Sequence, residues 1–426
     1  METPNRVVVV GGGIAGMETL FALRQRLGDR VALTLVADRP EFVFRPNMIY
    51  VPFGGAEDDV RIPLSSPAER RDIDVRHGKL AWVETEPQRV VLDDGCTVDY
   101  DYLVLATGAA MRPEEIPGLA EHAHLVWTLE QMRELGRALR RVRDAAVDGS
   151  PQHVLFLVPP GNRYPGPLYE LAFMLETWLR RSRVRDLVCL TFATCEETYL
   201  EAFGSGLRPV MAEEFAERGI IGYSQAEATG VEPHRVRFAD GTARTFDLLV
   251  SAVPQASAVD YEGLATDERG FLRTDLETRR VEGTDAVYAP GDAGDFPVKQ
   301  GFLSVLQADA VADDIASRID PEAVPSPRSF DPVGLYVMEM LDGAMFTQVP
   351  MTLTDDPEGS VRVREETPED YLVGVSPIWR LGKRTLGAYL PQQFRAGRPL
   401  HRGFPWGVLS LGLWGMSKAL AGRAER

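Results

Sequence analysis

The chain begins with a continuous apolar run that leads through a glycine-rich turn into apolar positions spaced as on a helix. The stretch RVVVVGGGIAGMETLFAL (6–23) therefore predicts a buried strand, a tight turn and a helix. The next apolar run, VALTLVAD (31–38), predicts a second buried strand. Continuous apolar runs of this kind are typical of parallel strands covered on both faces, so the pattern predicts an α/β fold.

The same succession of patterns returns further along the chain. HVLFLV (153–158) predicts a strand, and LAFMLETWLRR (171–181) has the spacing of an amphipathic helix. RPVMAEEFAERGI (208–220) predicts another helix, and RVRFADGTARTFDLLVSAV (235–253) predicts a hairpin followed by a strand. We therefore expect two Rossmann-like units in one chain.

The first turn carries glycines at G-x-G-x-x-G spacing, namely Gly11, Gly13 and Gly16. In a dinucleotide site the first glycine allows the tight turn, the second lets the backbone approach a pyrophosphate, and the third lets helix and strand pack closely. The helix N-terminus then presents unpaired N–H groups to the phosphate. Asp38 ends the second strand, where a carboxylate would hold a ribose hydroxyl. An acidic residue at this place favours FAD or NAD over NADP.

Two later strands favour FAD. YDYLVLATGAA ends its apolar run at Thr107 and Gly108, and DAVYAPGDAGDFP ends at Gly291 and Asp292. This pair resembles the family of flavoproteins with two dinucleotide-binding domains. The resemblance implies that the A-T-G strand returns the chain from the FAD domain and that Asp292 holds the ribityl chain. No cysteine or histidine stands in an obvious linkage context, so we expect FAD to be bound non-covalently.

The same resemblance implies the domain organisation. A discontinuous FAD domain is expected at 1–120 and 285–325, with a second Rossmann-like domain at 121–284 inserted into it. The proline-rich stretch DPEAVPSPRSFDP (320–332) marks a boundary. Residues 333–426 are expected to form a C-terminal extension of α+β or helical character.

Further segments resemble the sulfide:quinone oxidoreductase branch of these flavoproteins. EFVFRPNMIYVPFG is similar to its F-x-F-x-P-x-x-x-x-V segment, which implies that the backbone at Arg45 and Pro46 approaches the flavin nucleotide. FPVKQGFLSVLQADAVADDI is similar to its K-x-G segment, here Lys299 to Gly301, which opens a helix beside the isoalloxazine. A cation at Lys299 would stabilise the anionic reduced ring. The competing interpretation of Lys299 is a solvated surface lysine.

The chain departs from that branch at its reactive cysteines. The resemblance implies a cysteine pair near the flavin that takes up sulfane sulfur, and the matching positions here are Tyr164 and Tyr336. A phenol forms no persulfide and, with an ordinary pKa near 10, is a poor nucleophile. Two interpretations stay open: the rings fill the space left by thiols, or they bind or protonate a substrate at the flavin.

The three cysteines of the chain lie elsewhere. Cys96, Cys189 and Cys195 are assigned to strands, where a buried free thiol acts as a small hydrophobe. The spacing of Cys189 and Cys195 along one strand is too long for a disulfide between them. We therefore do not expect sulfide oxidation by the cysteine mechanism of the family.

The turn VPPGNRYPGPLYE occupies the place of a second nucleotide-binding turn. Pro159 and Pro160 remove N–H groups that a pyrophosphate would need, and Gly161 and Gly166 do not have the G-x-G-x-x-G spacing. We therefore expect the second domain to keep its wound shape without an NAD(H) site, and the turn to deliver Tyr164 toward the flavin.

Glu170 follows that turn at the start of a predicted helix. Of the two roles considered, we favour a first-turn carboxylate stabilised by the helix dipole over a proton carrier. The six histidines are scattered, and no metal-binding spacing such as C-x-x-C or H-E-x-x-H occurs in the sequence.

Composition limits the partners and the location. The chain has 426 residues and a net charge of −17, which argues against nucleic-acid binding because a phosphate backbone repels such a surface. No basic-then-apolar leader and no run of 18 apolar residues is present, so we expect a cytoplasmic protein. The apolar segment 404–423 predicts either peripheral contact with the inner face of the cell membrane or a helix buried against the body or a second subunit.

These observations lead to one main hypothesis and two alternatives. The main hypothesis is an FAD-dependent oxidoreductase that passes electrons from a small-molecule donor, at the Tyr164 and Tyr336 side, through FAD to a quinone. The first alternative is a single-subunit NADH:quinone reductase, which shares the two-domain plan. The second is a non-catalytic flavoprotein that acts as a membrane- or protein-binding module.

Overall fold

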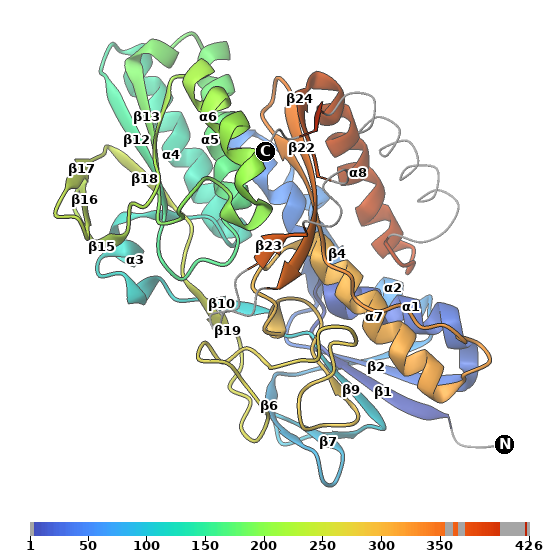
Figure 1. Cartoon of the computed structure of the whole chain (residues 1–426). Helices are drawn as coiled ribbons and strands as arrows, with labels where there is room; N and C mark the ends of the chain where they lie inside the picture. The colour runs from blue at the N-terminus through green and yellow to red at the C-terminus, as the bar shows by residue number, and fades with distance from the viewer. Residues whose placement is uncertain (1–3, 354–360, 365–370, 401–421, 424–426) are drawn as a thin grey trace.

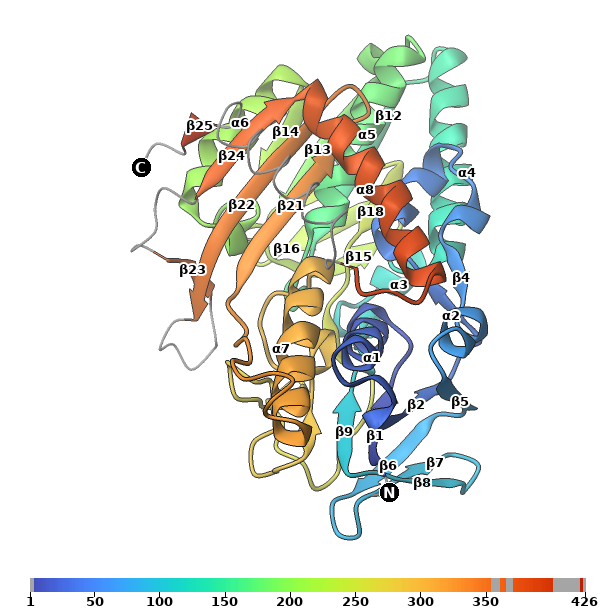
Figure 2. The same cartoon turned by 90° about the vertical axis from the view of Figure 1, so that its right-hand side faces the viewer.

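The computed structural model describes residues 4–353, 361–364, 371–400 and 422–423, and two five-stranded parallel sheets form its framework (Figures 1 and 2). The first sheet has the strand order β20-β9-β1-β2-β5. Its strands are β1 (Asn5–Val10), β2 (Val31–Ala37), β5 (Ile73–His77), β9 (Tyr102–Leu105) and β20 (Val287–Tyr288). Because β20 comes from much later in the chain than its neighbour β9, two separate stretches of sequence build this sheet.

Both faces of the first sheet are covered, which explains why β1 is apolar throughout. Val7 and Val9 belong to the core beneath helices α1 (Ile14–Leu27) and α7 (Gly301–Ile319), which lie side by side (Figure 2). Val8 points to the opposite face and a different core. A small antiparallel sheet covers that face; its strands are β6 (Leu80–Glu84), β7 (Arg89–Leu92) and β8 (Thr97–Asp99). Full burial of each valine stabilises the fold by about 2 kcal/mol.

The second parallel sheet has the order β11-β18-β12-β13-β14. Its strands are β11 (His124–Leu125), β12 (Gln152–Val158), β13 (Val188–Thr194), β14 (Ile220–Tyr223) and β18 (Leu248–Ser251). Phe156 of β12 contributes to the core beneath the helices α4 (Leu129–Val147), α5 (Gly166–Arg181) and α6 (Arg208–Glu217). Leu155 and Leu157 contribute to the core on the other face, under the meander of β15 (Ala228–Glu232), β16 (Arg235–Phe238) and β17 (Ala243–Thr245).

Short elements connect the two parallel sheets. An antiparallel ribbon forms where the chain passes between them in each direction; its strands are β10 (Ala109–Met111) and β19 (Gln255–Ser257). The parts of the chain built around the first and the second parallel sheet are called the first and the second unit. The remaining elements of the first unit are β3 (Glu41–Val43), the 3-10 helix η2 (Arg45–Phe53), β4 (Arg61–Pro63) and α2 (Ser65–Glu69). Helix α3 (Leu119–His122) precedes the second sheet.

The C-terminal part adds an antiparallel sheet and one long helix. The described strands are β21 (Val333–Glu339), β22 (Ala344–Leu353), β23 (Val361–Val363), β24 (Leu372–Ser376) and β25 (Gly422–Arg423). Helix α8 (Pro377–Arg395) packs on this sheet through Trp379, whose ring stacks on Phe346 of β22 with centroids 4.5 Å apart. Ser376 caps α8 by accepting a hydrogen bond from Ile378 N.

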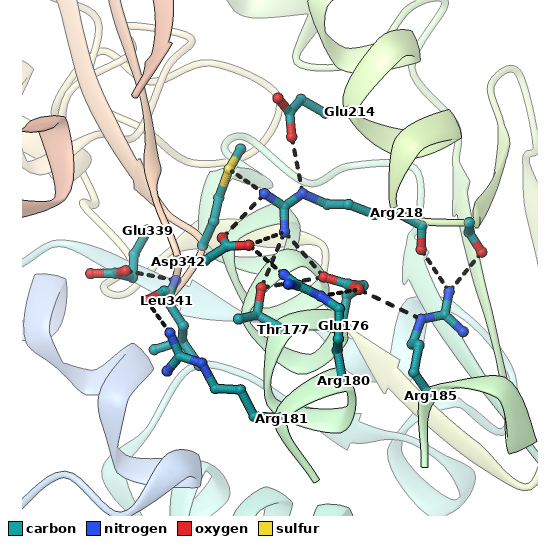
Figure 3. Close-up of polar contacts among 12 residues, drawn as sticks. Glu176, Thr177, Arg180, Arg181, Arg185, Glu214, Arg218, Glu339, Leu341 and Asp342 are labelled. Atoms are coloured by element: carbon teal, nitrogen blue, oxygen red, sulfur yellow. Dashed lines mark hydrogen bonds and ion pairs between the residues drawn. The ribbon is translucent and has the colours of Figure 1, made fainter. Parts of the chain in front are cut away.

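A cluster of charged residues fastens the turn between β21 and β22 to the second unit (Figure 3). Arg218, just after α6, donates to Asp342 of that turn and to the buried Glu176 of α5. Arg181 donates to the carbonyl oxygen of Leu341 at 2.9 Å. The low exposure of Glu176, 4%, makes this ion pair costly to break, so the turn that follows β21 is held against α5.

The predicted α/β fold with two Rossmann-like sheets and a C-terminal extension is confirmed. The predicted hairpin and strand at 235–253 correspond to β16, β17 and β18. The domain boundaries remain predictions. The segment 404–423, predicted to contact a membrane, the body of the protein or a second subunit, lies outside the described residues except for its last two positions. Within the described ranges, no helix has both the length and the apolar character needed to cross a membrane.

Candidate active site

The first glycine turn has the geometry of a phosphate-binding turn. Gly11 has a φ of +112°, and a Cβ there would lie 2.2 Å from the carbonyl oxygen of Ala106. A Cβ on Gly16 would lie 2.0 Å from the Gly11 carbonyl oxygen, so α1 and β1 approach closely only with glycine at both positions. A Cβ on Gly13, by contrast, would meet nothing within 4 Å, and no side chain caps α1. The N-terminus of α1 is therefore open to an anionic group.

The other residues predicted to hold FAD lie around this turn. Asp38 follows β2, with a half-exposed side chain available to a ribose. Thr107 and Gly108 follow β9, and Gly108 has a φ of +79° with no atom within 4 Å of the place a Cβ would take. Gly291 lies against α1, because a Cβ there would be 2.9 Å from the Cβ of Ala15.

Three charged side chains predicted to contact FAD share one buried environment. Arg45 and Pro46 open η2, and the Arg45 guanidinium lies 4.2 Å from the ring centroid of Trp127. Burial lowers the pKa of Arg45 and raises the pKa of Asp292, and the attraction between the two opposes both shifts. Lys299 also interacts with Asp292. No hydrogen bond joins these three described side chains to one another. Buried charges in this arrangement fit a polar cofactor that passes all three.

Lys299 is buried, so its interpretation as a solvated surface lysine is wrong. Its Nζ donates to the carbonyl oxygen of Gly294 and lies 3.7 Å from the ring centroid of Phe271. Burial lowers the pKa of Lys299 to about 7, while Asp292 opposes the shift. Two residues later, Gly301 begins α7, where Ile14 of α1 leaves little room for a side chain. The K-x-G segment therefore places a cation and a helix N-terminus side by side.

The two tyrosines meet in the interior. Their ring centroids are 5.7 Å apart with an interplanar angle of 70°. Gln300, next to Lys299, donates from Nε2 to the Tyr164 hydroxyl at 3.2 Å and to the Leu335 carbonyl oxygen. Its Oε1 is buried without a hydrogen-bond partner among the described residues. An unpaired acceptor beside the phenol pair and the start of α7 marks a place for a further donor.

The turn before α5 closes the second nucleotide-binding position. Asn162 donates to the carbonyl oxygen of Val253 at 2.7 Å, which fixes the turn against the end of β18. The Tyr164 ring then lies over the start of α5, because a Cβ on Gly166 would be 2.6 Å from its Cζ and Oη atoms. A phosphate on the N-terminus of α5 would need the volume that this ring occupies.

Glu196 also argues against a nucleotide site next to the second parallel sheet. It follows β13 as Asp38 follows β2, the place where a nucleotide domain presents its ribose-binding carboxylate. Here Glu196 accepts hydrogen bonds from the Tyr169 hydroxyl at 2.7 Å and from Thr194 Oγ1 at 2.7 Å. Glu201 N donates to it as well, at 3.0 Å. This carboxylate is used within the protein, so it is not directed toward a ribose.

Comparison with known proteins relates the N-terminal part to a described family. Residues 5–154 match the family described as pyridine nucleotide-disulphide oxidoreductase. The match extends from β1 to the start of β12, so it covers the N-terminal part of the chain.

Individual relatives extend the similarity. The sulfide-quinone reductase of Aquifex aeolicus is 30% identical over 247 residues, which cover 57% of this chain and 56% of that protein. An NADH dehydrogenase-like protein of Bacillus subtilis is 24% identical over 75% of this chain and 85% of its own length. The structure of the sulfide:quinone oxidoreductase from Aquifex aeolicus superposes with a TM-score of 0.83, at 22% identity, over 96% of this chain and 95% of that one.

The family match over residues 5–154 and these relatives support two predictions: that the chain is an oxidoreductase, and that its cofactor is FAD. The geometry agrees, because the open N-terminus of α1, the carboxylate of Asp38 and the buried charges near Asp292 fit that cofactor. The roles of individual site residues remain predictions.

The interpretation of Glu170 as a carboxylate in the first turn of its helix is wrong. Helix α5 begins at Gly166, so Glu170 lies a full turn inside it, with 3% of its side chain exposed. It accepts hydrogen bonds from Tyr336, Lys383 and the backbone of Glu339. Sequence reasoning missed Glu339 and Lys383, although an acid within the apolar strand VGLYVMEM was a signal of a buried polar site.

The assignment of the cysteines to buried strand positions is wrong for two of the three. Cys96 lies in the turn between β7 and β8 and is exposed, and Cys189 is exposed on β13. Cys195 follows β13, and burial raises the pKa of its thiol to about 12. Tyr164 and Tyr336, not cysteines, thus occupy the space beside Gln300. Among the described residues, no group of His, Cys, Asp or Glu is arranged to hold a metal ion.

Proposed function

We propose that this oxidoreductase takes electrons from a small-molecule donor bound beside Tyr164 and Tyr336 and passes them through FAD to a quinone. The observation that carries the proposal is the buried phenol pair next to the start of α7, with the unpaired Gln300 Oε1 beside it. A reaction centre needs placed hydrogen-bonding groups in a dry site, and this arrangement supplies them.

The residues that would hold FAD are those of the first unit. Gly11, Gly13 and Gly16 would accommodate the pyrophosphate and Asp38 a ribose, with Arg45, Pro46, Thr107, Gly108, Gly291, Asp292 and Gly301 lining the rest. The cofactor supplies the capacity to accept and release two electrons. Lys299 places a positive charge where it would stabilise the reduced form, and this is its proposed catalytic contribution.

The tyrosines set the kind of donor. Burial raises the pKa of both phenols, so Tyr164 and Tyr336 remain neutral and act as hydrogen-bond donors and acceptors. A neutral phenol does not attack sulfur, so the proposed donor is a polar small molecule that is oriented by hydrogen bonds rather than bound through a persulfide.

The proposed acceptor rests on relatives. The Aquifex aeolicus relative is named a sulfide-quinone reductase. Since a quinone is dissolved in the lipid bilayer, the proposal includes peripheral contact with the inner face of a membrane. The part of the segment up to residue 421, on which the predictions of membrane contact or of a second subunit depend, lies outside the described residues.

An anaerobic flavin-bleaching screen tests the function. Sulfide, NADH, NADPH, thiols and a panel of polar small-molecule reductants are mixed with the purified holoprotein, and the reduced protein is then reoxidised with a short-chain quinone. We expect sulfide and both nicotinamide nucleotides to leave the flavin oxidised, and the quinone to restore the colour after reduction. Full reduction by micromolar sulfide within turnover time would overturn the argument from the tyrosines.

The second candidate is a single-subunit NADH:quinone reductase. The similarity to the NADH dehydrogenase-like protein of Bacillus subtilis, over 75% of this chain, favours it. The Tyr164 ring over α5 and the internally bonded Glu196 argue against it. Rapid bleaching by NADH in the same screen would decide in its favour.

A further inference from the structure

A fully buried arginine, Arg279, lies in a turn that precedes β20, with 1% of its surface exposed. Its φ of +57° is in the left-handed region, where glycine is the usual residue and a side chain costs free energy. Burial of a guanidinium is costly as well. Because a glycine would form the same turn without either cost, the contacts of the Arg279 side chain hold the explanation for its presence.

The Arg279 side chain is committed to one carboxylate. Its Nη2 donates to Asp295 Oδ1 at 3.0 Å, and Thr274 Oγ1 donates to the same oxygen at 2.6 Å. The ring centroid of Phe330, from the proline-rich boundary segment, lies 5.6 Å from the guanidinium carbon. Among the described side chains, Asp295 is the one ion-pair partner of Arg279.

The segment that contains Asp295 also contacts Lys299. The carbonyl oxygen of Gly294, the residue before Asp295, accepts from Lys299 Nζ. The guanidinium packs on the same glycine, since a Cβ on Gly294 would lie 3.0 Å from Arg279 Nη2 and 2.4 Å from the carbonyl oxygen of Ala289. Arg279 and Lys299 therefore bind to two neighbouring residues of one short turn.

Backbone hydrogen bonds fix this turn against the segment 271–274. Leu272 N donates to the carbonyl oxygen of Ala293 at 3.0 Å, and Asp295 N donates to the carbonyl oxygen of Leu272 at 2.9 Å. Phe271 begins that segment, and its ring centroid lies 3.7 Å from Lys299 Nζ. The backbone thus holds Asp295 in place, and the side chains around it decide which cation its carboxylate pairs with.

Lys299 has two carboxylates near it and pairs with neither. Asp292 and Asp295 both attract its ammonium. In the described part of the chain, however, no acidic side chain forms an ion pair with Lys299, whose Nζ contacts a carbonyl oxygen and the ring of Phe271. Two buried cations therefore share the neighbourhood of Asp295, and Arg279 has taken it.

We propose that Arg279 is a positioning residue of the flavin site: it holds the carboxylate of Asp295 and so leaves the ammonium of Lys299 unpaired and free to stabilise reduced FAD. Arg279 needs no contact with the cofactor for this role, because it acts through Asp295 and Lys299. The proposal rests on the proposed function, since it assumes that Lys299 stabilises the reduced cofactor.

The charges around Lys299 predict opposite effects of two substitutions. Burial lowers the pKa of Lys299, Asp292 and Asp295 oppose the shift, and Arg163 and Arg279 add to it. Arg279→Met should raise the pKa of Lys299, because it removes a repelling cation and frees the charge of Asp295. Asp295→Asn should lower the pKa, because Arg279 then repels the ammonium without a counterion.

Redox titrations test the proposal without an electron donor or a quinone. The midpoint potential of the FAD-loaded protein is measured by dye equilibration with dithionite, from about pH 5 to about pH 10, with Lys299 present and in Lys299→Met. The gap between the two potentials reports the charge of Lys299. The pH at which this gap falls to half its maximum, the half-gap pH, reports when that charge is lost.

The same pair of titrations is repeated in Arg279→Met, in Asp295→Asn and in the variant with both substitutions. The double variant removes both partners of the buried ion pair, so it is the least costly of the three to fold. Arg273→Met is the matched control, because Arg273 is an exposed arginine in the adjoining segment and donates to the carbonyl oxygen of Thr266 instead. FAD content and thermal midpoint show which variants are folded and loaded.

We expect the half-gap pH to rise by on the order of one unit in Arg279→Met and to fall by a similar amount in Asp295→Asn. The double variant and Arg273→Met should stay close to the wild type. An ion pair that only stabilises the fold predicts no such opposite shifts. An unchanged half-gap pH in the two single variants, or shifts in the same direction, would overturn the proposal.

The double variant keeps the test decisive if Arg279→Met does not retain FAD. In that case a downward shift in Asp295→Asn that the double variant reverses supports competition for Asp295. A downward shift that persists in the double variant contradicts it, because the repelling arginine is then gone.

The outcomes separate this inference from the proposed function. If the bleaching screen finds no donor, or no reoxidation by quinone, the proposed function fails while the titrations still report on Arg279. If Lys299→Met leaves the potential unchanged at every pH, the proposed role of Lys299 fails and this inference fails with it. If the gap is present but does not respond to Arg279 and Asp295, only this inference fails.

Discussion

The ring of Tyr164 lies directly over Gly166, the first residue of α5. A Cβ at Gly166 would be 2.6 Å from the Cζ and Oη atoms of that ring. The tyrosine therefore needs glycine beneath it, and together the two residues cover the helix N-terminus that would otherwise face a second nucleotide. The same contact places the phenol of Tyr164 next to Tyr336 and Gln300.

This contact predicts that Gly166→Ala destabilises the protein through overpacking, by about 1–3 kcal/mol. Removing the ring relieves the clash, so the alanine should cost much less in a Tyr164→Ala background. Urea unfolding of the two single variants and the double variant, all loaded with FAD, measures both costs. Equal costs in the two backgrounds would show that the ring does not lie over Gly166.

The positions of the thiols predict that cysteine chemistry is dispensable. Cys96 and Cys189 are exposed, and burial raises the pKa of Cys195 to about 12, which leaves almost no thiolate near neutral pH. The variant with all three cysteines replaced by serine should therefore keep its FAD and its rate of flavin reduction. Stopped-flow reduction of the variant and the wild type by the same reductant makes the comparison. A loss of more than tenfold would return a thiol to the mechanism.

The buried ammonium of Lys299 predicts a change in reduction potential. Lys299→Met keeps the apolar stem and removes the charge that would stabilise a reduced, anionic flavin. The midpoint potential of the flavin should therefore fall by on the order of 30 mV, which is about 1.4 kcal/mol for two electrons. The exposed Lys79→Met is the control and should leave the potential unchanged. Dye-equilibration titrations measure both.

The same residue predicts how this difference depends on pH. Burial lowers the pKa of Lys299 to about 7, so the side chain carries its charge below that pH and loses it above. The gap in potential between the wild type and Lys299→Met should be largest near pH 6 and shrink toward pH 9. A gap that is constant over this range would mean that Lys299 does not titrate there.

Glu196 predicts a pH dependence of stability. Burial raises its pKa from 4.5 to about 7, opposed by hydrogen bonds from Tyr169 and Thr194. A raised pKa in the folded state favours the protonated form, so this contribution is fully present below about pH 4.5 and is lost as the pH rises through about 7.

Glu196→Gln imitates the protonated form and should remove that loss. The stability of the wild type should therefore decline relative to the variant between pH 5 and pH 8, by up to about 3 kcal/mol. Urea midpoints at several pH values measure the trend, with the exposed Glu227→Gln as the control. Parallel curves for the wild type and Glu196→Gln would contradict the assignment.

The local features of this protein could be predicted from its sequence. The apolar runs of β1, β2 and β12 indicate strands covered on both faces, and the spacing of Gly11, Gly13 and Gly16 indicates a phosphate-binding turn. Such features depend on backbone conformation and on neighbours within one strand–turn–helix unit, so a short window of sequence contains the information. The match of Tyr164 and Tyr336 to a cysteine pair likewise came from motifs, and the structure brings the two rings together.

The partners of the buried charges were decided by the tertiary structure. Glu170 occurs in an ordinary amphipathic helix, and only the packing of β21 and α8 against α5 converts it from a surface carboxylate into a buried acceptor bonded to Tyr336 and Lys383. Those partners lie 166 and 213 positions away in sequence, beyond any local pattern. Burial then raises the pKa of Glu170, because the cost of removing a charge from water depends on everything packed around it.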